Sequence, residues 1–350
     1  MNVQRYFPLF IIAALVVAVQ LLATAAGQPF YLTQLTMAAY YTIVVVGLCM
    51  LMGYAGQISM GHAGFFAIGG YVSAALTTAD FSAMVHTGLG RLMVKAACIA
   101  LGKDLYGADI ARLNPWVAFI VAILITIVIA YLIGVPVLRL KGHYLAMATL
   151  GFGSIIYKIV LGTRVLGGAD GISGVPEFTL VPGLSVTGSV AARVPNYYIA
   201  WSLVLLAALF MHNLVDSRAG RALRSIHGNE EAAAAMGVDT ARYKLGLFII
   251  SAVFASIAGI FLTHYNGGIG PSEASIMKSV RYVAVVAVGG MANLWGAVLA
   301  SVALNFLSLR GYFGSYDEAV FGGILVLVML FAPNGILMKM DWLKRSKGGS

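Results

Sequence analysis

Long apolar runs separated by short polar links dominate the chain. A membrane-spanning helix needs roughly 20 mainly apolar residues. Runs of about that length cover residues 9–26, 31–52, 58–78, 114–138, 144–161, 196–214, 245–264 and 318–332. No segment alternates with the period of two that a membrane β-barrel requires. The pattern predicts an all-α polytopic membrane protein, in which residues 1–350 form one bundle of about eight full transmembrane helices.

One further apolar run, 281–309, is interrupted at Gly289-Gly290 and again from Asn293 to Gly296. A single crossing would leave the two chain ends on opposite sides of the membrane. Two half-length pieces that enter and return would leave both ends on the same side. Broken backbone at membrane depth is tolerated where it is buried in protein or lines a cavity. We expect a re-entrant segment, with Gly289 and Gly290 beside the transport path.

Composition and charge agree with a membrane location. The chain is 60% hydrophobic and 10% charged, against roughly 25% charged residues in soluble domains. Its net charge of +9 comes mainly from Lys and Arg in the short links, which follows the positive-inside bias and argues against a nucleic-acid partner. We expect both termini, the 215–244 loop and the basic 333–350 tail to be cytoplasmic, with the 79–113 and 162–195 loops on the outer side.

Two local features have simple structural interpretations. The first run ends in Ala23-Thr24-Ala25, as a signal peptide does, but further apolar runs follow at once, so we interpret it as an uncleaved first helix. Cys49 lies in an apolar run and Cys98 in a loop. Neither has the spacing of a metal site or of a disulfide framework.

The segment from Gly53 to Gly64, GYAGQISMGHAG, carries four glycines at membrane depth. Glycine costs about 1 kcal/mol relative to alanine inside a helix, so this density favours unwound or closely approached backbone. Polar residues inside membranes usually face the bundle interior. The segment supplies the other candidates for the translocation path: Gly56, Gln57, Ser59, Gly61 and His62. The alternative is that Gln57 and His62 only hydrogen-bond neighbouring helices.

A second segment, between the spans 196–214 and 245–264, predicts a short helix. Asn229 is a good N-cap residue, and the macrodipole favours Glu230 and Glu231 in the first turn. Ala232 to Ala235 are strong helix formers, and Gly237 provides a stop. The expected product is a helix of about seven residues, roughly 10 Å long, on the cytoplasmic side. Such a helix is suited to pressing on another protein.

These segments together resemble the LivM-type permeases of branched-chain amino-acid ABC importers. The similarity rests on Gly53–Phe66, on Arg221–Ala233 (RALRSIHGNEEAA), and on the Gly289-Gly290-Met291 and Trp295-Gly296-Ala297 pair. Gly168-Ala-Asp-Gly-Ile172 also agrees with that family. The similarity extends from about residue 35 to 337. The I-x-L-P tail that follows this pattern in many importers is missing after Gly237, which fits the branched-chain group. The 79–113 loop is longer than the family would suggest.

The resemblance implies partners that the chain cannot replace. The sequence has no phosphate-binding loop of the type G-x-x-x-x-G-K-[ST], so the chain is not expected to be the ATPase. The resemblance implies two cytoplasmic ATP-binding subunits, which hold the ATP and Mg, and no cofactor is expected in this chain. It also implies a second LivH-like permease and a periplasmic binding protein, in the bacterial inner membrane. Asn229, Glu230, Glu231, Ala232, Ala233 and Gly237 would form the coupling helix that enters a groove on an ATPase.

The expected activity is alternating-access transport of branched-chain amino acids, driven by ATP hydrolysis on the partners. The same machinery carrying urea, short amides or another small organic solute is an open alternative. A secondary transporter would need acidic residues inside the spans, where the apolar runs show almost none. A membrane-embedded enzyme would need a catalytic motif, and we find none in the spans.

Overall fold

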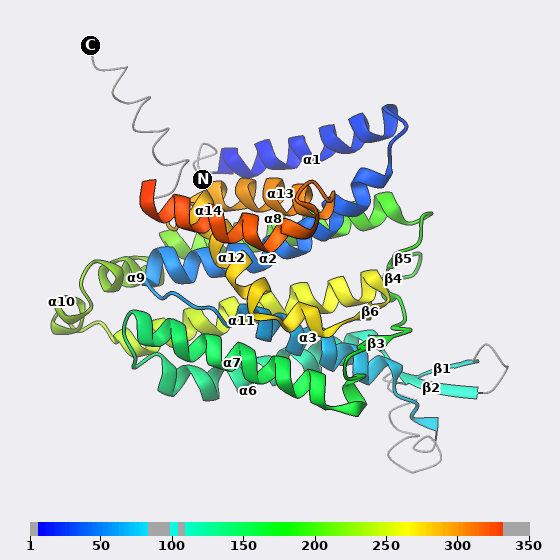
Figure 1. The fold of residues 1–350 in the computed structure, drawn as a ribbon, viewed down its shortest axis with the longest axis horizontal. Helices are drawn as coiled ribbons and strands as arrows, with labels where there is room; N and C mark the ends of the chain where they lie inside the picture. Colours follow the sequence, from blue (N-terminus) through cyan, green and yellow to red (C-terminus); the bar gives the residue numbers. More distant parts are fainter. Residues whose placement is uncertain (1–5, 83–98, 104–108, 332–350) are drawn as a thin grey trace.

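Helices make up most of the protein (Figure 1). The computed structural model describes residues 6–82, 99–103 and 109–331. Its α-helices are α1 (Phe7–Ala25), α2 (Phe30–Ala55), α3 (His62–Thr78), α6 (Pro115–Val137), α7 (His143–Gly162), α8 (Arg193–Asp216), α9 (Arg218–Gly228), α10 (Glu230–Ala235), α11 (Thr240–Asn266), α12 (Ile276–Gly289), α13 (Leu294–Leu309) and α14 (Asp317–Phe331). Every apolar run contains one of these helices, and the interrupted run contains two, so the helical, polytopic class is confirmed.

Six helices of the described residues are long and apolar enough to cross a membrane: α1, α2, α6, α7, α8 and α11. This is fewer than the eight full spans that the apolar runs predict. Helix α3 has 17 residues because the chain between Gly56 and Gly61 is irregular, although those residues extend the apolar run. Hydropathy alone does not register this loss of helical backbone.

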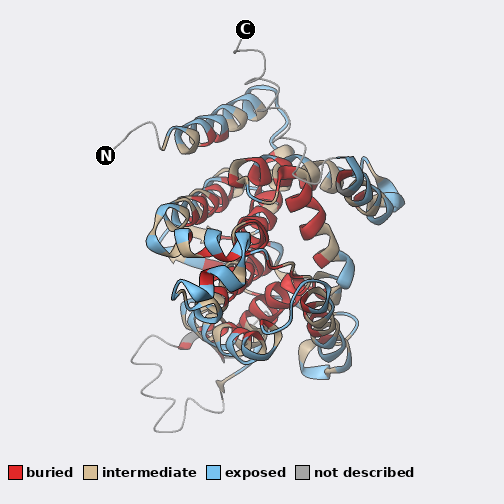
Figure 2. Cartoon of the chain, turned by 90° about the vertical axis from the view of Figure 1, so that its left-hand side faces the viewer, coloured by how far each residue is buried: buried red, intermediate tan, exposed pale blue. Residues whose placement is uncertain are grey.

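Helices α2 and α11 form the centre of the bundle. Helix α2 packs against α8, α11 and α13, and α11 packs against α3 and α6 as well. Small residues allow these close contacts: a Cβ at Gly69 would come 2.5 Å from Ser256 Oγ of α11. Figure 2 shows the buried residues gathered around this centre, with α1 standing at the edge. Only 11% of the apolar window of α1 is buried, so the rest of the chain leaves most of this helix uncovered.

The interrupted run doubles back on itself. Helix α12 ends at Gly289, Gly290 takes a positive φ of 96°, and α13 begins at Leu294. The two helices are antiparallel, since Gly289 lies against Ala297 while Arg281 donates a hydrogen bond to Ser308. The predicted break and return of the chain are therefore present. Helix α14 then packs beside α12.

The two ends of the bundle differ in structure. Helices α9 and α10 project from one end, and three small antiparallel sheets lie at the other (Figure 1). The sheets pair β1 (Ile99–Lys103) with β2 (Asp109–Leu113), β3 (Ile172–Ser173) with β6 (Gly268–Ile269), and β4 (Phe178–Val181) with β5 (Leu184–Val186). The 3₁₀ turns are η2 (Arg164–Leu166), η3 (Pro271–Ala274) and η4 (Gly314–Tyr316). The all-α prediction was incomplete here, because long loops satisfy part of their backbone by pairing.

The described chain begins and ends at the same end of the bundle as α9. Tyr6 donates a hydrogen bond to Asn213 Oδ1 at 3.2 Å, next to the end of α8, and α14 finishes at this end as well (Figure 1). Residues 6 and 331 thus lie at one end of the bundle (Figure 1), and the placement of both termini on the cytoplasmic side stays a prediction. The basic tail 333–350 and much of the 79–113 loop lie outside the described residues.

Candidate functional site

The predicted short helix is present as α10, one residue shorter than expected. Asn229 accepts a hydrogen bond from the backbone of Ala232 at 3.0 Å and so caps its first turn. Gly237, with a positive φ of 84°, closes its last turn, where its N–H donates to Ala234. A helix of six residues is too short to be stable alone in water. Its stability must therefore come from packing and from charge.

Two lysines of the membrane domain supply that charge. Lys244, in the first turns of α11, lies 2.6 Å from Glu230, and Lys141, in the link between α6 and α7, lies 3.3 Å from Glu231. Partial burial by itself raises the pKa of Glu230, but the hydrogen bond and charge of Lys244, with Lys141, more than offset it, so the pKa is lowered. Helix α10 is thus attached to two separate parts of the bundle.

The alanine surface of α10 divides into two sides. Ala233 is buried against the rest of the chain, at 5% exposure. Ala232, Ala234 and Ala235 are exposed, and Met236 after them is 86% exposed. The expectation that Ala233 itself enters a groove on a partner is therefore wrong for this conformation. The outer side of α10 and Met236 are available for a partner instead.

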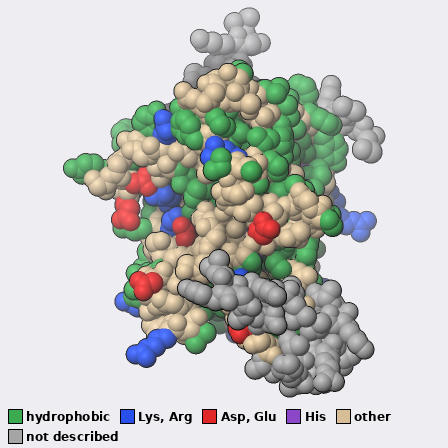
Figure 3. All heavy atoms as spheres, turned by 90° about the vertical axis from the view of Figure 1, so that its right-hand side faces the viewer, with side chains coloured by type: hydrophobic (Ala, Val, Ile, Leu, Met, Phe, Trp, Pro, Cys, Tyr) green, Lys and Arg blue, Asp and Glu red, His purple; other side chains and the backbone are tan. Residues whose placement is uncertain are grey.

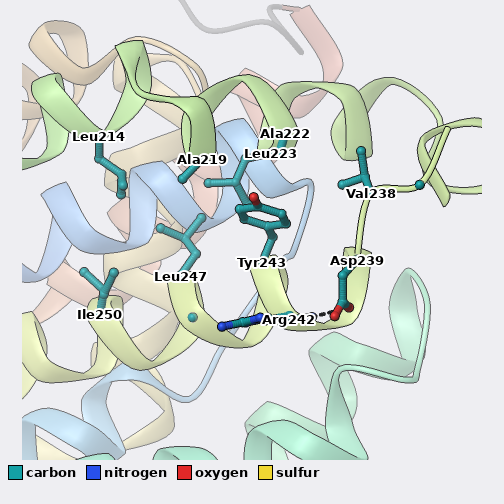
Figure 4. Close-up of a pocket in the computed structure, with 12 residues that line it drawn as sticks. Leu214, Ala219, Ala222, Leu223, Val238, Asp239, Arg242, Tyr243, Leu247 and Ile250 are labelled. Carbon is teal, nitrogen blue, oxygen red and sulfur yellow. Dashed lines mark hydrogen bonds between the residues drawn. The ribbon is translucent and has the colours of Figure 1, made fainter.

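Helix α9, which the sequence pattern did not predict, supports α10. Ser217 caps it by accepting from Gly220. Its apolar residues Leu223 and Ile226 are buried, while its arginines point outward. Between α9 and the start of α11 lies a cavity of about 720 Å³. Figure 4 shows its apolar lining and, at one edge, Asp239 and Arg242, where Asp239 caps α11.

The glycine-rich segment between α2 and α3 is a packing junction. Gly56 ends α2 with a positive φ of 65°, and a Cβ there would meet His227 of α9 at 2.8 Å. A Cβ at Gly61 would come 2.7 Å from the carbonyl of Thr149 in α7. The hydroxyl of the same threonine accepts from the backbone of Met60 at 2.9 Å. The glycines are therefore required by close neighbours.

His62 is fully hydrogen-bonded inside the protein. Its Nε2 lies 2.7 Å from Ser251 Oγ of α11, and its Nδ1 lies 3.2 Å from Ser59 Oγ. This geometry favours the structural interpretation for His62 and Ser59. Gln57 differs, because it is 2% exposed and neither atom of its amide has a hydrogen-bond partner among the described residues. Gln57 remains the open candidate of this segment.

The turn between α12 and α13 lies against the same end of α2. Cys49 approaches the carbonyl of Met291 at 3.4 Å, and Tyr54 donates to the carbonyl of Ala292 at 3.1 Å. Gly289 allows α12 to touch α13 closely. The structure thus brings both broken segments to one end of α2, near α9. It brings Gly289 into contact with α13 and places Gly290 in the turn that ends α12.

A charged cluster inside the bundle was not predicted from the sequence. Glu273 and Lys278 form an ion pair of 2.9 Å that also contacts Tyr41 near the middle of α2. Arg281 of α12 pairs with Asp317 of α14. The expectation of almost no charge at membrane depth was therefore wrong for this region. The available signal was Lys278 just before the run 281–309 and Arg281 at its first position, with Glu273 before the run and Asp317 after it.

This arrangement defines a multi-pass helical membrane protein of the permease class, with broken helices inside and a tethered, capped helix at one end. The chain belongs to the family described as "Branched-chain amino acid transport system / permease component", whose model matches residues 30–332. That match covers most of the chain.

Curated relatives agree with this family. The chain is 31% identical to the high-affinity branched-chain amino acid transport system permease protein LivM of Salmonella typhimurium, over 97% of this chain and 77% of the relative. It is 30% identical to LivM of Escherichia coli, over 95% and 77%. It is also 26% identical to the permease protein LivH of Escherichia coli, over 86% and 92%. No solved structure matches the chain.

Proposed function

We propose that this chain is the membrane-spanning permease subunit of an ABC importer that carries branched-chain amino acids. The observation that carries the proposal is the family match over residues 30–332, together with the similarity to LivM over nearly the whole chain. The tethered helix α10 at one end of the bundle supports a subunit that responds to a partner.

The partners follow from the two ends of the molecule. Two cytoplasmic ATP-binding subunits, which hold the ATP and Mg, would dock at the end that carries α9 and α10. A periplasmic binding protein would dock at the opposite end, where acidic and basic side chains are both exposed (Figure 3). The similarity to LivH as well as LivM supports pairing with a second, related permease in the bacterial inner membrane. Both termini are then cytoplasmic.

Motion would pass from the ATPase to the spans through α10. Its two glutamates are bound to Lys244 of α11 and to Lys141 of the α6–α7 link. A displacement of α10 therefore pulls on two sides of the bundle at once, while the capped ends keep it helical. Alternating access needs such a connection between the nucleotide cycle and the helices.

One residue near α9 is the main candidate for contact with the solute. Gln57, which is buried with an unpartnered amide, is the strongest of the candidates near α9. Gly56, Gly61 and Gly289 support the shape of this region through close contacts with neighbouring helices, and Gly290 supports it through its positive φ. Urea or a short amide as the transported solute is the second candidate, and uptake assays with each solute distinguish it.

The docking proposal is tested at Met236, the most exposed apolar side chain of the loop. Met236→Arg places a bulky charge where an ATPase would cover the methionine, and burying an unpaired charge is strongly unfavourable. We expect loss of ATPase co-purification with an unchanged thermal melt of this chain. Val190→Arg, at an exposed apolar residue of the opposite end, is the matched control and should keep the ATPase bound. Normal co-purification of Met236→Arg would contradict the assignment.

The orientation is tested by labelling. In a background with Cys98→Ser, a cysteine at Ser225 of α9 should react only with a membrane-permeant reagent, because α9 is placed in the cytoplasm. A cysteine at Val190 should react with an impermeant reagent added outside. Buried Cys49 should stay silent in both cases. The reverse pattern would invert the proposed topology.

A further inference from the structure

The η3–α12 segment holds an ion pair at the mid-depth of the bundle. Lys278 Nζ lies 2.9 Å from Glu273 Oε1 and donates to Tyr41 Oη at 3.0 Å. Tyr41 in turn donates to the same carboxylate oxygen at 3.1 Å, and the ammonium lies 4.5 Å from the centre of its ring. Tyr41 is near the middle of the 26-residue helix α2. The three groups therefore form a compact triangle far from either end of the bundle.

Several polar atoms around this triangle are not used. The second carboxylate oxygen of Glu273 and the hydroxyls of Tyr71 and Tyr282 are buried without a hydrogen-bond partner among the described residues. Tyr71 and Tyr282 are only 2% and 1% exposed. Tyr71 packs in one cluster with Ala274, the residue after Glu273, and the ring of Tyr282 lies 6.3 Å from that of Tyr41. Buried polar atoms are normally paired, so this group has capacity for a ligand.

The ion pair also has an open side. Its two side chains are each 19% exposed, and neighbouring Ser272 and Met277 are exposed. In Figure 1 this segment lies between α7 and α14, and it contacts both helices. Ionisable side chains at membrane depth face protein or a water-filled path rather than lipid. The open side therefore faces either protein or a water-filled path.

We propose that Glu273, Lys278 and the tyrosines around them form a binding station for a zwitterionic α-amino acid on the translocation path, an inference that rests on the proposed function. The carboxylate of Glu273 takes the ammonium of the solute. Lys278 takes its carboxylate, and the hydroxyls of Tyr71 and Tyr282 complete the polar contacts. When the solute binds, Glu273 and Lys278 separate and each pairs with the opposite charge on the solute. Every charge therefore stays paired.

The chemistry selects a zwitterion over a neutral solute. The costly step in moving an amino acid through a low-dielectric path is the desolvation of its two charged groups. A protein ion pair that opens toward them offers each group an opposite charge, in a charge-assisted hydrogen bond. Urea or a short amide carries no full charge, so it would leave the carboxylate of Glu273 and the ammonium of Lys278 less well satisfied than in the closed pair.

The first test measures uptake by the complete complex in proteoliposomes, with the binding protein added. Glu273→Gln and Lys278→Met should each lower the rate of branched-chain amino-acid uptake by at least about tenfold, as for a lost charge-assisted hydrogen bond. Binding-protein-stimulated ATP hydrolysis should fall much less. Arg281→Met with Asp317→Asn neutralises a similarly buried pair between α12 and α14. It should keep uptake within about threefold, because Arg281 donates its hydrogen bonds to Ser308 and Asp317, outside the triangle of Glu273, Lys278 and Tyr41.

A double variant separates recognition from a purely structural role. Glu273→Gln with Lys278→Met leaves no unpaired buried charge, so it should melt closer to the wild type than either single variant. If the pair only holds η3 in place, uptake should recover with the stability. We expect uptake to stay at least about tenfold low. Recovery to the rate of the Arg281–Asp317 control would overturn the proposal.

The third test uses the detergent-solubilised complex without the binding protein. Leucine should raise its melting temperature more than 3-methylbutylamine or 3-methylbutanoate, each of which carries one of the two charges. Lys278→Met should remove this difference. Equal shifts with all three compounds would contradict the zwitterion station. Failure of the wild-type complex to take up any branched-chain amino acid would instead contradict the proposed function, so the two failures are distinguishable.

Discussion

The segment from Gly53 to Gly64 and the segment from Pro271 to Tyr282 meet at α3, yet they differ in what they leave unused. In the first, His62, Ser59 and the backbone of Met60 all have protein partners, and only Gln57 does not. In the second, one carboxylate oxygen of Glu273 and the hydroxyl of Tyr282 have none among the described residues, and the hydroxyl of Tyr71 in α3, which packs in one cluster with Ala274, has none either. The first segment is conspicuous in the sequence, and the second is not.

The comparison shows that a conspicuous sequence motif need not be a ligand-binding site. Dense glycine marks places where backbones touch, and such contacts are needed for assembly of the bundle whatever the solute is. A binding station needs polar atoms that the protein itself does not satisfy, held where a ligand can reach them. On this criterion the first segment mainly positions α3, α7 and α11. The second is equipped to receive a solute.

The largest effect should come from closing a glycine contact in the first segment. Gly53→Ala places a methyl group on the carbonyl of Met291, so α2 and the α12–α13 turn must separate. Overpacking of this kind costs about 1–3 kcal/mol, and here more, because the obstacle is backbone. We expect failure of the purified chain to give a cooperative melt. Gly151→Ala, where a Cβ meets nothing within 4 Å, should melt normally.

An intermediate effect should follow from removing a hydrogen-bond partner in the same segment. Ser251→Ala leaves Nε2 of buried His62 without its partner at 2.7 Å, and an unsatisfied buried group costs about 1–3 kcal/mol. The check is the melting temperature in detergent, with exposed Ser272→Ala as control. A variant as stable as the wild type would show that His62 has a polar contact to spare, and so would return it to the path candidates.

Much of the fold could be predicted from local sequence patterns. Apolar runs of helix length indicate helices wherever they occur, and the residues from Asn229 to Gly237 specify the capped α10 by short-range chemistry alone. Helix α9 was not predicted, because its short amphipathic pattern has few apolar residues and lies in a segment rich in arginine. Two of those apolar residues, Leu223 and Ile226, are buried against other helices. This burial depends on tertiary packing, which the local sequence pattern does not show.

The candidate station could not be predicted in the same way. Glu273 and Lys278 lie between two predicted spans, in a stretch that resembles an ordinary polar link. Their significance depends on Tyr41, 237 positions from Lys278 along the chain, and on Tyr71 of α3. A hydrogen bond left unmade is a property of the packed bundle. No local spacing encodes it, so periodicity and motif matching do not reveal it.

A smaller effect is expected from an ion pair at the aqueous end, which provides a reference for the pair at mid-depth. The pKa of Glu230 is held below its ordinary value of 4.5, so its stabilising contribution is present at neutral pH and is lost as the pH falls below about 4.5. Glu230→Gln should therefore lower the stability by up to about 1 kcal/mol at pH 7. Melts of both proteins should converge on acidification.

Glu231→Gln is the control for this measurement. Its pair with Lys141 is largely exposed on both sides, and such pairs contribute little to stability. A change within about 0.5 kcal/mol at all pH values is expected. If instead Glu230→Gln and Glu231→Gln behave alike, the pair between Glu230 and Lys244 does not fix α10 to α11, and the proposed route of coupling would pass through packing alone.

The smallest effect on stability, and the sharpest contrast between the two segments, should come from Tyr71→Phe. The hydroxyl of Tyr71 has no partner among the described residues, so its removal deletes a desolvated polar group and should leave stability unchanged or raise it by up to about 1 kcal/mol. Uptake should nevertheless fall, by about tenfold if the hydroxyl binds a charged group of the solute. A loss of transport without a loss of stability is what a structural residue does not produce.

Two other tyrosines provide controls for Tyr71→Phe. Tyr197 donates to the carbonyl of Val16 at 3.1 Å, so Tyr197→Phe should lower the stability by about 1 kcal/mol and leave uptake intact. Tyr40 has an unpartnered hydroxyl like that of Tyr71, but its ring packs against Phe261 and Tyr265 of α11. Tyr40→Phe should therefore change neither stability nor uptake for the worse. If Tyr40→Phe and Tyr71→Phe slow uptake equally, an unmade hydrogen bond is not a mark of the path, and the distinction between the two segments fails.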